Sequence, residues 1–92
     1  MRFEFKKTYD RTTKKLPTEI KLELKEVAMD VVDVISTGKK PAKGIRLTHL
    51  RKDYWEASKG MKERIIFKLT GDFIQFILAG SHDDVKRFLK SI

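Results

Sequence analysis

The spacing of apolar residues changes from three or four positions to two near Ile45, and this change constrains the fold more than any other feature. Before it, one apolar stripe of a helix runs between Pro17, which suits a first helical turn, and Gly38, which suits a helix end. The stripe consists of Ile20, Leu24, Val27, Ala28, Val31, Val34 and Ile35. A helix with one apolar side needs an apolar surface to cover, so the sequence predicts an α+β fold with this helix on one face of a sheet.

Segments with alternating or continuous apolar residues predict the strands of that sheet. In chain order they are residues 2–6, 45–48, 54–58, 64–69 and 73–79. Gly71 suits a hairpin turn between the last two, and the nearly unbroken apolar run from Phe73 predicts a strand covered on both faces. A further helix is expected over residues 8–15. A short basic helix is expected after Ser81, which with Asp84 has the spacing of a capping box.

Composition indicates one small basic domain. The 92 residues are enough for a single domain, residues 1–92, and too few for two. Lys and Arg number 21 against 13 Asp and Glu, a formal net charge of +8, which indicates RNA, DNA or an acidic protein as a partner. The alternative is a basic surface that serves solubility. Because cysteine is absent and no segment has the apolar length of a membrane span, a soluble cytoplasmic protein without a membrane partner is expected.

Three groups of residues, taken together, resemble a known family. A strand from Leu47 to Leu50 leads into Tyr54-Trp-Glu, Arg64 begins the next strand, and the chain from Gly80 reads Gly-Ser-His-Asp-Asp-Val. In order and spacing these residues resemble the RelE/ParE superfamily of toxins from toxin–antitoxin pairs, and within it the RelE-like mRNA interferase branch. The resemblance implies a RelE-like fold. Such a fold is an antiparallel sheet of four to five strands, with N-terminal helices on one face and a site on the other, beside a short C-terminal helix.

The resemblance also implies an activity and partners. RelE-like relatives are endoribonucleases that cleave mRNA on the ribosome through attack of the 2′-hydroxyl, without a metal or other cofactor, and so inhibit translation. The implied partners are a cognate antitoxin, mRNA and the ribosome. Two alternatives stay open: a ParE-like toxin that inhibits DNA gyrase, and an inactive member that only binds an antitoxin or RNA. The second is suggested by Trp55, Ala57 and Ser58, which stand where some members carry basic side chains.

Three residues are the candidate catalytic groups that the resemblance implies. Arg64 suits a phosphate because its planar guanidinium stays charged and binds two oxygens at once; the alternative is an ion pair with Glu56 or Asp72. His82 suits proton transfer near neutral pH, and the alternative is a surface histidine beside a helix cap. Glu56 is a candidate base, or else a carboxylate that orients Arg64.

Further residues are candidates for RNA binding. The basic ones are Lys59, Lys62, Lys68, Lys86 and Arg87, each of which alone is more often a solvated charge. Trp55 and Phe88 are candidates for stacking on a base, with the protein core as the alternative. Asp83 and Asp84 follow His82, but adjacent carboxylates at a helix start are explained by the helix dipole, so no metal site is expected.

Overall fold

The computed structural model describes residues 1–60 and 62–92, and these form a five-stranded sheet and three helices. In chain order the elements are β1 (Arg2–Phe5), α1 (Lys7–Thr13), α2 (Thr18–Thr37), β2 (Arg46–Arg51), β3 (Tyr54–Ser58), β4 (Arg64–Thr70), β5 (Phe73–Gly80) and α3 (His82–Lys90). Every helix and strand expected from the sequence is present, so the α+β prediction is confirmed. Within the described residues, no helix has the length and apolarity needed to cross a membrane.

The strands have the order β1-β5-β4-β3-β2. From β2 to β5 each strand pairs antiparallel with the next, as expected. β1 instead runs parallel to β5, with Phe3 opposite Ile74 and Phe5 opposite Phe76, so the expected antiparallel sheet is corrected to a mixed one. The direction of β1 follows from packing, because Lys6 N donates to Phe76 O at 2.9 Å and the chain then turns directly into α1, which packs against β5.

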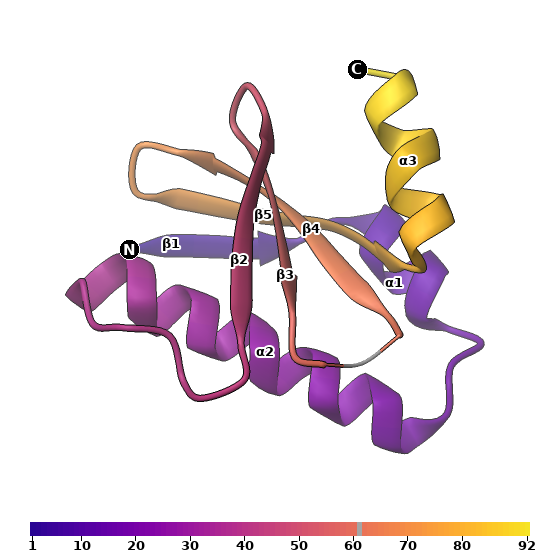
Figure 1. Cartoon of the computed structure of the whole chain (residues 1–92), viewed down its shortest axis with the longest axis horizontal. Helices are drawn as coiled ribbons and strands as arrows, with labels where there is room; N and C mark the ends of the chain where they lie inside the picture. Colours follow the sequence, from indigo (N-terminus) through magenta and orange to yellow (C-terminus); the bar gives the residue numbers. More distant parts are fainter. Residues whose placement is uncertain (61) are drawn as a thin grey trace.

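The main core lies between the sheet and the two N-terminal helices. Its buried members are Tyr9 of α1, Leu24, Val27, Ala28 and Val31 of α2, and Ala57, Ile65, Phe67, Ile74, Phe76 and Ala79 of the sheet. In Figure 1, α2 lies across the strands on this side. The buried α2 residues belong to the predicted stripe, which is therefore the face turned to the sheet. α2 ends at Gly38, whose φ of 75° is a left-handed conformation that glycine adopts without strain.

The opposite face of the sheet is partly covered, by α3. β5 is fully buried only at Ile74, Phe76 and Ala79, and its other residues are half-buried, so the expected strand covered on both faces is corrected. Ile66 of β4 and Val85 of α3 are buried but lie outside the main core cluster. They belong to elements that are in contact, because α3 packs against both β4 and β5. The remainder of this face is open to a ligand.

Hydrogen bonds fix both ends of α3. The capping box predicted at its start is confirmed: Ser81 Oγ accepts from Asp84 N at 3.3 Å, and Asp84 Oδ2 accepts from Ser81 N at 2.8 Å. At its other end, Nη1 of Arg51 in β2 donates to Leu89 O at 3.3 Å and to Ile92 O at 3.2 Å. α3 is thus attached to β2 as well as to β5. Figure 1 shows α3 rising from the end of β5, clear of α2.

Candidate functional site

Arg64 lies at the first position of β4, on the sheet face opposite the two N-terminal helices. Its direction follows from alternation, because its neighbour Ile65 and then Phe67 point into the main core. There Arg64 lines a hollow of about 350 Å³ together with Gly44, Arg46, Ser58 and Gly60. We call this hollow the β2–β4 cleft. It is on the face where the resemblance placed the site.

Glu56 of β3 is the acidic partner of Arg64. Arg64 Nη1 lies 3.4 Å from each of the two carboxylate oxygens of Glu56, so the ion pair weighed in the sequence forms with Glu56 and not with Asp72. Glu56 is 8 % exposed, whereas the Arg64 side chain is 31 % exposed. Arg64 Nε is buried without a hydrogen-bond partner in the described part of the chain. The carboxylate therefore holds the guanidinium through Nη1, and the partly exposed side chain lines the cleft.

His82 is the first residue of α3 and is exposed. Gly80 is the β5 residue paired with Arg64, so His82 follows two positions after the strand position beside Arg64. His82 does not line the β2–β4 cleft, and no hydrogen bond or ion pair joins it to Arg64 or Glu56 within residues 1–60 and 62–92. Its proton-transfer role stays a prediction.

The basic residues expected to bind RNA fall in three places. Lys59 and Lys62 lie in the connection from β3 to β4, at the same end of the sheet as the cleft, and both are exposed. Lys68 lies further along β4, with its Nζ 5.8 Å from the ring centre of Tyr54. The third place is α3, which carries the exposed residues Lys86 and Arg87; Arg87 pairs with Asp84. RNA binding by this set stays a prediction.

The two aromatic candidates lie in different environments. Trp55 points to the helix side of the sheet, where its ring stacks on Phe67 with 6.5 Å between centroids. That position favours the core alternative over base stacking. Phe88 of α3 is half-buried and packs edge-to-face on Tyr54 at 5.1 Å. Its ring thus supports α3 on the open face of the sheet.

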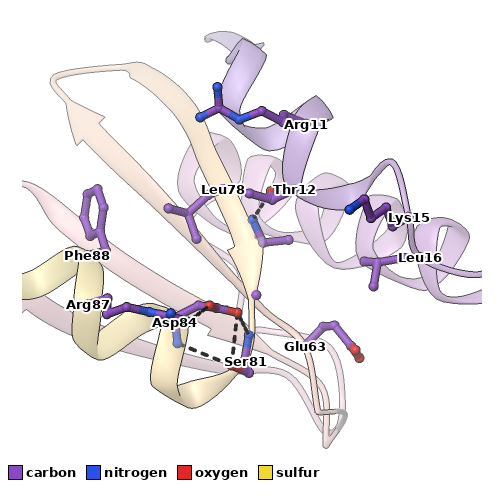
Figure 2. A pocket seen from close by; sticks show the side chains of 12 residues that line it. Arg11, Thr12, Lys15, Leu16, Glu63, Leu78, Ser81, Asp84, Arg87 and Phe88 are labelled. Carbon is purple, nitrogen blue, oxygen red and sulfur yellow. Dashed lines mark hydrogen bonds and ion pairs between the residues drawn. The ribbon is translucent and has the colours of Figure 1, made fainter.

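A larger hollow, of about 630 Å³, lies between α1 and α3 (Figure 2). Figure 2 shows Arg11 and Lys15 on its α1 side, Arg87 and Phe88 on its α3 side, and Leu78 of β5 between them. Its floor includes the last part of β5, which extends beyond the end of β1. A side chain of α1 hydrogen-bonds to the edge of β5 there, since Ala79 N donates to Thr12 Oγ1 at 3.1 Å.

Asp84 lies on the wall of this second hollow and is held ionised by its neighbours. The hydrogen bond from Ser81 N lowers the pKa of the Asp84 carboxyl, and the Ser81 hydroxyl and the Arg87 guanidinium lower it further. The two contacts with Ser81 belong to the cap at the start of α3, and Arg87 reaches Asp84 from the last turn of the same helix. No group of three or more His, Asp or Glu side chains that could hold a metal ion is found among the described residues.

Arg46 is the residue of the cleft that the sequence reasoning missed. It begins β2 and is in register with Ser58 of β3. Alternation with Leu47, which packs against the core, was a signal that Arg46 points to the open face. Its approach to Arg64 depends in addition on the register of β2, β3 and β4, which no local pattern specifies.

The fold of this chain is the one seen in solved structures of RelE-like toxins. Although no protein-family model and no curated protein matches the sequence, solved structures of toxins from this class match nearly the whole chain. The RelB–RelE antitoxin–toxin complex from Methanococcus jannaschii aligns with a TM-score of 0.68 and 16 % identity, over 91 % of this chain and 95 % of that chain.

Two further structures from bacteria agree. YafQ from Escherichia coli aligns with a TM-score of 0.63 and 16 % identity, over 92 % of this chain and 98 % of that chain. The toxin–antitoxin complex RelBE2 from Mycobacterium tuberculosis aligns with a TM-score of 0.62 and 16 % identity, over 88 % of this chain and 96 % of that chain. The chain therefore has the RelE-like fold, in agreement with the resemblance noted in its sequence.

Proposed function

We propose that this protein is the toxin of a toxin–antitoxin pair and an endoribonuclease that cleaves mRNA, with the ribosome as the place of cleavage. One observation carries the proposal: on the open face of a RelE-like fold, the Arg64 guanidinium faces a cleft while a single carboxylate holds it from behind. The fold alone supports a toxin, and the cleft adds a place for a phosphodiester.

The proposed reaction is attack of a ribose 2′-hydroxyl on the adjacent phosphorus. A base removes the 2′ proton, the bond from phosphorus to the 5′ oxygen breaks, and an acid gives a proton to that oxygen. The products are a 2′,3′-cyclic phosphate and a new 5′-hydroxyl end. Negative charge grows on the phosphate oxygens during the reaction, and a fixed guanidinium that stays protonated stabilises that charge. Arg64 has this role in the proposal.

His82 and Glu56 are assigned different parts. His82 is exposed next to the strand position that pairs with Arg64, where an imidazole can exchange protons with solvent and with a bound nucleotide, so we assign it proton transfer. Glu56 is almost completely buried behind Arg64, which suits a residue that orients the guanidinium better than one that reaches RNA. The reaction as proposed needs no metal ion.

The proposed partner that controls the toxin is a cognate antitoxin. Two of the similar structures, from Methanococcus jannaschii and Mycobacterium tuberculosis, are described as toxin–antitoxin complexes. A net charge of +8 favours an acidic antitoxin segment, because complementary charge steers association. A segment that covers the β2–β4 cleft would separate Arg64 from RNA and so keep the toxin inactive.

The test is to map new 5′ ends on an mRNA that is being translated in a cell-free system. Wild type is compared with Arg64→Ala, His82→Ala and the control Arg2→Ala, all at equal concentration of folded protein. Arg2 is a matched control because it lies on β1, at the opposite edge of the sheet. We expect cuts with a 5′-hydroxyl for wild type and Arg2→Ala, and a loss of about 100-fold or more for the other two variants.

Three outcomes would contradict all or part of the proposal. Intact mRNA with every variant, including wild type, would leave a non-catalytic binding role. Complete and reversible loss of cleavage in a chelator would overturn the metal-free reaction, because the proposed groups are all side chains of the protein. Cleavage that persists in Arg64→Ala would remove Arg64 from the site.

A further inference from the structure

The β2–β4 cleft contains a second arginine that the proposed reaction does not use. Arg46 of β2 and Arg64 of β4 both line it, from the two sides of β3. Arg46 of β2 is paired with Ser58 of β3. On the other side of β3, Ala57 is paired with Ile65 of β4, so Arg64 lies one position further along, level with Ser58. Both arginines therefore begin their strands at the same end and on the same face of the sheet.

Charge in the cleft is not balanced. Arg64 is paired with Glu56 at 3.4 Å, and its Nε has no hydrogen-bond partner within the described residues. For Arg46, no hydrogen bond or ion pair of the side chain is found within the described residues, and it is exposed. The cleft is thus lined by two guanidinium groups, and no carboxylate is among its described lining residues. Two cations on one hollow repel each other, and an anion between them relieves the repulsion.

The remaining lining of the cleft leaves room for such an anion. Gly44 and Gly60 have φ values of 89° and 58° and present no side chain, and a Cβ placed at Gly60 would meet nothing within 4 Å. Ser58 adds a hydroxyl that can donate to an oxygen. The volume of about 350 Å³ is far larger than the roughly 30 Å³ share of one water molecule.

We propose that Arg46, together with Arg64, forms a two-arginine site for the backbone of RNA, in which Arg46 binds a second phosphate of the same strand. That the ligand is RNA is inferred from the proposed function. That the site binds an anion is inferred from the residues of the cleft alone. Arg46 is a substrate-binding residue in this proposal and takes no part in proton transfer.

This site also explains why β3 has no basic residues at three positions. Trp55 and Ala57 point to the helix side, so basic side chains there would not reach the cleft. Ser58 does face the cleft, and Arg46 stands directly opposite it on β2. The positive charge that β3 lacks is therefore supplied by the next strand.

Binding of an uncleavable RNA tests the proposal without depending on catalysis. The probe is a single-stranded ten-nucleotide RNA in which every 2′-hydroxyl is methylated, titrated at several salt concentrations. Arg46→Gln is compared with Arg2→Gln, which removes the same side chain at the opposite edge and opposite end of the same sheet. Arg46→Lys keeps the charge in the cleft and serves as the third variant.

We expect Arg46→Gln to weaken binding about tenfold and to lower the slope of log affinity against log salt by about 0.7, the value for one lost contact with a single strand. Arg46→Lys should recover the slope, and Arg2→Gln should change the affinity less than twofold. Equal effects of Arg46→Gln and Arg2→Gln, or no measurable binding by wild type, would overturn the site.

The two proposals fail in different ways. If translating mRNA stays intact while Arg46→Gln alone weakens binding of the methylated probe, the arginine site stands and the endoribonuclease does not. If mRNA is cleaved while Arg46→Gln binds the probe as Arg2→Gln does, the role of Arg46 is wrong and the nuclease stands. Inorganic phosphate gives a further check, because it should shift the Nε–H resonances of Arg46 and Arg64 and leave that of Arg2 in place.

Discussion

Arg64 Nη1 lies 3.4 Å from both carboxylate oxygens of Glu56, across neighbouring strands, and Glu56 is the more buried member of the pair. A carboxylate in this position limits the directions in which the guanidinium can point. It also neutralises part of the charge that a bound phosphate would otherwise meet. The pair is therefore a device for presenting one face of Arg64 to the β2–β4 cleft.

The first prediction concerns Glu56→Gln, which keeps the size of the side chain and its acceptor for Arg64. We expect the single-turnover rate of RNA cleavage to fall by less than about tenfold, because general bases contribute on the order of 100-fold or more. A larger fall in a fully folded variant would instead make Glu56 the base. Arg2→Gln is again the control for loss of a polar side chain at a remote place.

The second prediction concerns stability at the same pair. Arg64→Ala leaves Glu56 buried without its partner, and we expect the free energy of unfolding to fall by about 1 kcal/mol, since partial exposure of Arg64 limits the cost. Adding Glu56→Gln should restore part of the loss. Urea unfolding of wild type, both single variants and the double variant gives the coupling energy. A coupling of zero would mean that the contact contributes nothing to folding.

Tyr9 gives the third prediction, in alkaline solution. Its side chain is buried in the core, and burial raises the pKa of the phenol to about 12, with a smaller contribution from Asp10. In the unfolded chain the phenol ionises near its ordinary value of about 10. The contribution of the protonated phenol to the free energy of unfolding is therefore complete below pH 10, and it decreases as the pH rises through 12. It falls by on the order of 1 kcal/mol at pH 11.

Tyr9→Phe isolates this effect from the titration of lysines. Urea midpoints of wild type and Tyr9→Phe are measured at pH 8 and pH 11. The free energy of unfolding of wild type, relative to that of the variant, should fall between the two pH values. A difference that stays constant would show that the phenol is accessible to solvent in the folded protein.

The fourth prediction concerns the cap of α3. Ser81→Ala removes the hydroxyl that accepts from Asp84 N, and the free energy of unfolding should fall by about 1 kcal/mol. The pKa of Asp84 is lowered, mainly by the hydrogen bond from Ser81 N, so its contribution is present above about pH 4 and is lost as the pH falls through the folded value.

Asp84→Asn separates the two parts of the cap. Its free energy of unfolding should match that of wild type more closely at pH 3 than at pH 7. Only wild type has a carboxylate at position 84, and this group loses its charge between these values. Amide exchange at Val85 and Phe88 reports on α3 itself. Unchanged protection of both amides in Ser81→Ala would mean that packing against the sheet, such as that of Phe88 on Tyr54, holds the helix rather than the cap.

Local patterns were sufficient for most of the fold. The stripe from Ile20 to Ile35 specified α2, and alternation specified which residues of β4 face the core, because both signals are set by neighbours in sequence. The direction of β1 was not predicted. Its partner is distant, since Glu4 and Gln75 bond across 71 positions, and the choice between parallel and antiparallel depends on how α1 packs.

The candidate site was predicted mainly from the family resemblance, and only part of it follows from local patterns. Arg64 and Glu56 were named because the resemblance implies them as catalytic groups, and the structure brings the two side chains together as an ion pair. Arg46 was missed because its place in the cleft requires the registers of three strands. His82 was named because the resemblance implies it, and only the backbone relation to Arg64 through Gly80 is observed.

The parallel pairing of β1 with β5 has a consequence for the order in which the protein folds. β2 to β5 are joined by short connections and can form early, whereas β1 must wait until the segment Phe73–Gly80 exists, although it is the first strand to be synthesised. We therefore expect the strands that bear Arg46 and Arg64 to pair before the sheet is complete, and the pairing of β1 with β5 to be the last step in forming the sheet.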